Sequence, residues 1–154
     1  MISDEISNDF LRSNSMFGGL TNSELNIVRT FLVQKSFQKG QYILVQGETN
    51  STLYFIISGD VVIKKYHIDP KKDEREIVQL HKGDSFGEME LIDIQNCAAS
   101  VLCLTDFDTI TLSNSSLYQL STINLKIYTL IIMNLARDIS RRLRSTDDLL
   151  AMLS

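Results

Sequence analysis

The segment with the clearest chemical pattern is Gly83–Val101, and its central feature is the carboxylate of Glu88. Gly87 precedes this acid directly, and the small residues 98–100 follow it. Small residues let the backbone approach a ligand closely, and consecutive amides in such turns form concavities that bind polar groups. We therefore predict a backbone cradle for a small polar ligand. An acid also favours the N-terminal end of a helix, so capping of a short helix at 86–91 is an alternative role for Glu88.

Residues that carry catalysis do not occur at the required spacings. His67 and His81 have no partner at metal-ligand spacing. The chain has no GxSxG, no GxxxxGK[ST], and no cysteine placed with a histidine. Glu88 and Glu90 lie two positions apart in a helical segment, so they point to different sides. We predict no enzymatic activity, no metal site and no required cofactor.

Length and charge set the next limits. With 154 residues, the chain is long enough for one domain with a real core, and we predict a single domain over 1–154. Hydrophobic residues make up 44% and charged residues 22%, which argues against disorder. A net charge of −4 gives no electrostatic footprint for nucleic acid or an anionic membrane, so neither is an expected partner.

The two cysteines, Cys97 and Cys103, do not form a disulfide framework, and a reducing cytoplasm is the expected location. Residues 1–15 lack the apolar centre of a signal peptide. The longest apolar run, near Ile127–Met133, is far short of the ~20 residues that span a membrane.

Helices are expected at the start of the chain, within residues 1–33. Thr21 and Glu24 form a capping box, which predicts a helix from Asn22 to about Leu32. A weaker helical pattern covers residues 3–14.

From residue 34 to 112 the hydrophobic period is two, and glycines mark the turns. This pattern predicts a mainly β protein with flanking helices, built as an antiparallel β-roll or jelly-roll barrel. The predicted strands are Gln34–Phe37, Tyr42–Val45, Leu53–Ser58, Val61–His67, Glu76–Leu80, Ala98–Leu104 and Thr109–Leu112. Residues 69–73 form a charged, solvated hairpin tip.

A helical pattern returns over residues 114–154 and predicts C-terminal helices, the last of them long. Apolar residues there alternate in steps of four and three, which is the spacing of a coiled-coil seam and predicts a homodimer. The seam residues are Ile132, Ala136, Ile139, Leu143, Thr146, Leu150 and Leu153. Packing within one chain is the alternative. The arginines at 137, 141, 142 and 144 are interpreted as a solvated face, because no DNA-reading helix is expected after Ser154.

The order of a capped helix, a glycine-punctuated barrel with Phe86-Gly87-Glu88, and a long helix resembles the cyclic-nucleotide-binding domain family. This family includes bacterial catabolite activators and the regulatory subunits of cyclic-AMP-dependent kinase. The resemblance covers residues 17–147. Its turn glycines match Gly40, Gly47, Gly59, Gly83 and Gly87.

The resemblance implies a ligand site in the phosphate-binding cassette, residues 83–101. Glu88 would accept the ribose 2′-hydroxyl of cyclic AMP or cyclic GMP. Backbone amides near Met89, Glu90 and Ala98 would face the cyclic phosphate. The implied ligand-binding residues are Gly87, Glu88, Met89, Glu90, Cys97, Ala98, Ala99, Ser100, Thr146 and Asp147. Thr146 is both an implied base contact and a seam residue, so ligand contact and register control are alternative roles.

Two residues depart from the family pattern. Cys97 stands where the family has its phosphate-pairing arginine, and Glu90 replaces a small residue. Losing a buried charge partner costs about 2–5 kcal/mol, which weakens a site about 10²-fold or more. Lys126 is the only cationic residue between Gly83 and Arg137. Arg141 or Arg142 of the long helix is the remaining source of a cation, and the sequence does not choose between them.

Two functions follow. The first is a stand-alone regulatory module in signal transduction, in which ligand occupancy moves the long helix and changes the surface seen by an effector protein. The second is a degenerate domain without ligand that serves as a dimeric interaction scaffold. Cys97 and Glu90 favour the scaffold, whereas Glu88, the glycines and Thr146 favour the retained pocket.

Overall fold

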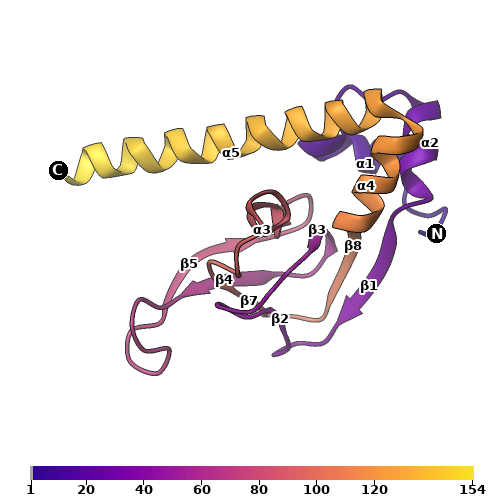
Figure 1. The fold of residues 1–154 in the computed structure, drawn as a ribbon. Coiled ribbons are helices and arrows are strands. Elements are labelled where there is room, and N and C mark those ends of the chain that lie inside the picture. Colours follow the sequence, from indigo (N-terminus) through magenta and orange to yellow (C-terminus); the bar gives the residue numbers. More distant parts are fainter. Residues whose placement is uncertain (1) are drawn as a thin grey trace.

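The computed structural model describes residues 2–154, which form two antiparallel sheets flanked by helices (Figure 1). The helices are α1 (Asn8–Ser13), the 3-10 turn η1 (Ser15–Phe17), α2 (Asn22–Arg29), α3 (Glu88–Asp93), α4 (Asn114–Ile123) and α5 (Leu125–Leu153). The strands are β1 (Val33–Phe37), β2 (Tyr42–Leu44), β3 (Thr52–Ser58), β4 (Val61–Lys65), β5 (Arg75–Leu80), β6 (Ser85–Phe86), β7 (Ser100–Cys103) and β8 (Phe107–Ser113).

The predicted antiparallel β fold is confirmed. One sheet has the order β1-β8-β3-β6 and the other β2-β7-β4-β5. The described pairings do not join the two sheets, so they form two layers rather than a closed barrel. The seven predicted strands all occur, with ends that differ by a few residues. The sequence analysis missed β6, because a two-residue strand is too short to show a period of two.

The N-terminal helices correct two predicted boundaries. The capping box is present: the Thr21 hydroxyl accepts the Glu24 amide at 3.2 Å, and Glu24 accepts the Thr21 amide at 3.1 Å. The helix it starts ends at Arg29 rather than near Leu32, because the following amides bond three residues back instead of four. The weak helix predicted over 3–14 is limited to Asn8–Ser13, whose N-cap is Ser7.

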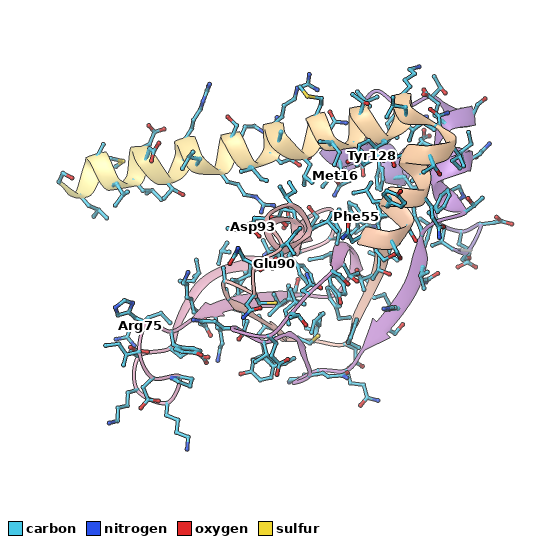
Figure 2. All side chains as sticks on the ribbon, in the orientation of Figure 1. Met16, Phe55, Arg75, Glu90, Asp93 and Tyr128 are labelled. Carbon is cyan, nitrogen blue, oxygen red and sulfur yellow. The ribbon has the colours of Figure 1, made fainter. Side chains whose placement is uncertain are left out.

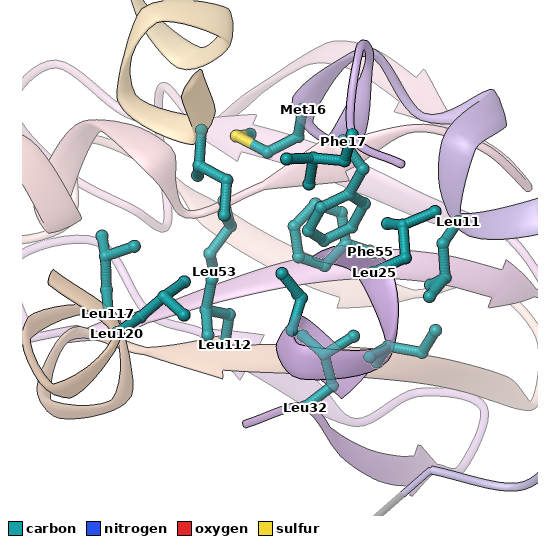
Figure 3. Close-up of a cluster of buried hydrophobic side chains, with 14 of the residues drawn as sticks. Leu11, Met16, Phe17, Leu25, Leu32, Leu53, Phe55, Leu112, Leu117 and Leu120 are labelled. Atoms are coloured by element: carbon teal, nitrogen blue, oxygen red, sulfur yellow. The ribbon is translucent and has the colours of Figure 1, made fainter. Parts of the chain in front are cut away.

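Strand β3 separates two hydrophobic cores. Leu53 and Phe55 face the helices, whereas Tyr54 and Ile56 face the second sheet, as the alternation of a strand requires. In the first core, the ring of Phe17 packs on Phe55 with centroids 4.8 Å apart (Figure 3). The molecule therefore has three layers, in which the β1-β8-β3-β6 sheet is covered by helices on one side and by the other sheet on the opposite side.

The last helix is packed on the body by the buried residues of its N-terminal half. Asn124 lies between α4 and α5, and its side-chain oxygen accepts a hydrogen bond from the Ile127 amide at 3.1 Å, which caps the start of α5. The buried Asn134 side chain donates to the carbonyls of Met16 at 3.0 Å and Gly18 at 2.9 Å. From Ser140 onward every residue of α5 is exposed, and the helix extends away from the body (Figure 1). Within residues 2–154, no helix has both the length and the apolar character needed to cross a membrane.

Candidate functional site

The Phe-Gly-Glu turn is held in place by the smaller core. Phe86 is buried, and its ring stacks on Tyr54 with centroids 4.9 Å apart and an interplanar angle of 6°. Gly87 is the N-cap of α3 with φ 89°, and a Cβ there would lie 2.5 Å from the Thr52 carbonyl oxygen. Only glycine satisfies both the left-handed conformation and this close approach. Helix α3 therefore begins at Glu88, not at Phe86 as predicted.

Glu88 is buried and paired with the long helix. Its side chain is 5% exposed, and Oε1 accepts a hydrogen bond from the Arg142 guanidinium of α5. Arg142 also donates to the Ser85 carbonyl at 3.4 Å. The second oxygen, Oε2, is buried and has no hydrogen-bond partner among the described residues. This ion pair joins the cassette to α5 across 54 positions of sequence, and it answers which arginine reaches the site.

The Arg142 side chain is half-exposed, and the rest of it is removed from water. Burial lowers the pKa of Arg142, and the carboxylate of Asp84 opposes that shift. An arginine stays protonated at neutral pH despite such a shift, so the pair consists of one cation and one buried carboxylate. The cation of the site is thus used to neutralise Glu88.

Glu90 binds the backbone of the cassette itself. Its side chain is directed from α3 toward the strands (Figure 2), and its Oε1 accepts the Ala98 amide at 3.1 Å. The residue is 9% exposed. A carboxylate of the chain therefore already occupies one of the amides that the family resemblance assigns to the ligand phosphate.

Cys97 is a packing residue in the smaller core. Its amide donates to the Glu48 carbonyl at 2.7 Å, and its own carbonyl accepts the Gly47 amide at 3.0 Å. Burial raises the pKa of the Cys97 thiol, and the nearby carboxylate of Glu90 raises it further. The thiol is neutral at pH 7 and offers no charge to an anion. Lys126 does not replace the missing cation here, because it pairs with Glu24 at 3.2 Å.

The structure brings residues 87–100 together as one cassette. Met89 is exposed, and Ala98 and Ala99 are half-buried. Ser100 is buried, and its hydroxyl accepts the Gln46 amide at 2.8 Å. Thr146 and Asp147 lie on the exposed part of α5. The Thr146 hydroxyl donates to the Arg142 carbonyl of its own helix at 3.0 Å, so in this state it is not bonded to the cassette.

Two open pockets border the cassette. One, of about 170 Å³, lies between the cassette and α5, and Asp84, Ser85, Arg141 and Arg142 are among its lining residues. The other, of about 270 Å³, is lined by Glu90 together with residues 49–51, 94–96 and Asn114. Among residues 2–154, no group of three or more His, Cys, Asp or Glu side chains is placed to hold a metal ion.

A two-layer β-roll, a glycine-anchored acidic turn and a long C-terminal helix are the architecture of a regulatory domain of the cyclic-nucleotide-binding type. A model of the family described as "Cyclic nucleotide-binding domain" matches residues 34–124. The chain therefore belongs to the cyclic nucleotide-binding domain family, as the resemblance predicted.

Individual relatives agree with this assignment. The "Cyclic AMP receptor protein" of Thermus thermophilus is 28% identical over 144 residues, which are 94% of this chain and 64% of that protein. The solved Thermus thermophilus catabolite activator protein superposes with a TM-score of 0.79 at 29% identity, covering 90% of this chain and 62% of that chain. The regulatory subunit of a cAMP-independent protein kinase A from Trypanosoma brucei gives 0.70 at 26% identity, covering 84% and 44%. The chain spans less than two thirds of each of these relatives.

Proposed function

We propose that this chain is a regulatory module in which a ligand in the cassette controls the position of α5. The observation that carries the proposal is the ion pair between Glu88 and Arg142. It joins the residue that the family uses for the ligand sugar to the helix that we predict to contact partners. A ligand that donates hydrogen bonds to Glu88 enters at the unpartnered Oε2 and weakens the hold of Arg142 on Oε1 of the same carboxylate.

The part of α5 after Ile139 is free to change position when a ligand binds the cassette. After Ile139, which packs against the larger core, the helix is exposed throughout. Arg142 is the residue of this exposed part whose side chain is bonded to the cassette. A ligand shifts a two-state equilibrium only by its difference in affinity for the two states, so displacement of Arg142 supplies the required difference. The exposed half of α5 then moves relative to the body.

The phosphate part of the site is atypical. Cys97 replaces the arginine, and Glu90 holds the Ala98 amide. We expect ordinary cyclic AMP or cyclic GMP binding to be about 10²-fold weaker than with an arginine, since a lost buried charge partner costs about 2–5 kcal/mol. The Trypanosoma brucei relative, described as cAMP-independent, is a precedent for this fold without a cyclic-AMP response.

The exposed half of α5 also supports a homodimer. Along the predicted seam, Ile132 and Ile139 pack partly on the core, whereas Leu143, Leu150 and Leu153 are 60%, 60% and 84% exposed. Three exposed leucines at heptad spacing favour pairing with a second helix. A variant with Leu143→Asp and Leu150→Asp should have the mass of a monomer in light scattering. If its mass equals that of the wild type, the seam is not the dimer interface.

The proposal is tested by following α5 while ligand is added. Hydrogen exchange of residues 140–153 is measured with cyclic AMP, cyclic GMP, adenosine or guanosine, and calorimetry gives the affinities. We expect at least one ligand to bind and to change exchange in α5. Arg142→Met should raise exchange in α5 without ligand, whereas Arg141→Met, whose partner Asp138 is on the same helix, is the matched control. If none of the four ligands gives heat at millimolar concentration, the proposal fails.

The scaffold is the second candidate, because Glu90 fills a ligand-binding amide from within the chain. In that case the fold and the α5 surface are functional, and the cassette is only structural. Replacing Cys97 by Arg separates the two functions. Restored binding of a cyclic nucleotide shows that the rest of the cassette is intact, whereas continued absence of binding favours the scaffold.

A further inference from the structure

We infer that the cassette takes an uncharged nucleoside in preference to a cyclic nucleotide. The inference rests on the proposed function and names the ligand class of the same site. It follows from the charges and hydrogen bonds that the structure places around α3.

The first argument is the balance of charge. Glu88 and Glu90 are 4% and 9% exposed, so both carboxylates are largely removed from water. One cation, Arg142, is paired with them, and it contacts Glu88. The Cys97 thiol is kept neutral by burial and by Glu90. The two buried carboxylates and Arg142 thus carry a net charge of −1 before a ligand arrives, and an anionic ligand would change it to −2.

The second argument is the occupancy of the backbone donor. The Ala98 amide donates to Glu90 Oε1 at 3.1 Å. A ligand phosphate would have to displace a carboxylate that lies eight positions away in the same segment and that forms no ion pair among residues 2–154. An uncharged ligand leaves this hydrogen bond in place. Glu90 is therefore a specificity-determining residue, which fills the place of the anion from within the chain.

The third argument is the vacant acceptor. Glu88 Oε2 is buried without a hydrogen-bond partner, and a buried carboxylate oxygen in this state favours any ligand that brings a donor. The hydroxyls of a ribose are such donors. The site therefore offers a buried acceptor to a sugar hydroxyl, and its excess of negative charge disfavours a phosphate. A nucleoside has the sugar hydroxyls and lacks the phosphate.

Calorimetry with two matched ligand pairs tests the inference: adenosine with cyclic AMP, and guanosine with cyclic GMP. The measured quantity is the ratio of the cyclic nucleotide Kd to the nucleoside Kd. A general loss of folding weakens both ligands of a pair, so the ratio reports the phosphate alone. For the wild type we expect a ratio well above one. An anion about 6 Å from Glu90 experiences repulsion equivalent to about 10²-fold in affinity at an effective dielectric constant of about 20.

Two variants change the ratio in a defined direction. Glu90→Gln removes the charge and keeps an oxygen that accepts the Ala98 amide, so the ratio should fall by 10-fold or more. Adding Cys97→Arg should bring it below one. Glu88→Gln should weaken both ligands and leave the ratio nearly unchanged. If the wild type binds cyclic nucleotides as tightly as nucleosides, the inference is overturned while the proposed function stands. If neither class binds, the proposed function itself fails.

Discussion

Removal of the Arg142 guanidinium should destabilise the protein more than removal of its neighbour. In Arg142→Met the Glu88 carboxylate, 5% exposed, keeps its charge but loses the one hydrogen-bond partner that residues 2–154 give it. Breaking a buried ion pair costs about 3–5 kcal/mol, whereas a surface pair is worth about 0–1. Because Arg142 is itself half-exposed, we place the loss in free energy of unfolding between these limits, at about 2 kcal/mol.

Urea denaturation followed by far-UV circular dichroism measures this loss. The matched control is Arg141→Met, which removes a pair with Asp138 on the same helix; the arginine side chain is 63% exposed and the aspartate 13%. Asp138 keeps the hydrogen bond from the Ser15 hydroxyl, so this loss should stay at about 0–1 kcal/mol. In the double variant Arg142→Met, Glu88→Gln, the uncompensated charge is gone, so part of the stability should return.

The pH dependence has a definite sign. In Arg142→Met the lone buried carboxylate favours its protonated form, so the extra destabilisation is full at high pH, shrinks as the pH falls toward about 4.3, the ordinary glutamate value of the unfolded chain, and is gone below it. Equal stability losses for Arg142→Met and Arg141→Met, together with no recovery in the double variant, would refute the pairing of α5 with the cassette.

Three further outcomes are expected from changes elsewhere. Gly87→Ala should lower the free energy of unfolding by more than the ~1–2 kcal/mol of a left-handed residue, because its Cβ would meet the Thr52 carbonyl. Gly40→Ala has open space around it and should lose only the conformational part of this free energy. Equal losses for the two variants would contradict this reasoning. The hydrogen bond from the Thr21 amide lowers the pKa of Glu24, so wild-type stability should fall as the pH drops below about 4.3. Glu24→Gln should flatten that part of the pH profile of stability, as measured by urea denaturation. An unchanged profile would count against the capping box. Burial raises the pKa of Cys97, so its thiol should react with a disulfide reagent only as fast as the protein opens; prompt reaction of the native protein would show the thiol to be exposed.

Local sequence patterns were sufficient for most of the fold. The capping box placed the start of α2 correctly, since both of its hydrogen bonds lie within one turn of chain. Alternation and turn glycines located seven strands, and the Phe-Gly-Glu turn was found because its glycine is required by the backbone itself. The errors fell where the local signal is weak. Strand β6 has only two residues. The end of α2 depends on a change from four-residue to three-residue hydrogen-bond spacing, which no residue type at these positions predicts.

The site shows the difference between sequence and tertiary structure most directly. The sequence by itself determined that the cassette Gly83–Val101 has an acid at the family's sugar-binding position, lacks the family's arginine and gains Glu90, because these are residue identities at fixed spacings. Only the tertiary structure decided where the charges go. Arg142 reaches Glu88 from a helix 54 residues further along the chain, and Glu90 turns back onto the Ala98 amide. The Arg142 contact depends on how α5 packs on η1 and α4, and packing between distant segments leaves no periodic pattern in the sequence. The Glu90 contact spans eight positions, but it depends on the path of the chain between α3 and β7, which no periodic pattern specifies either.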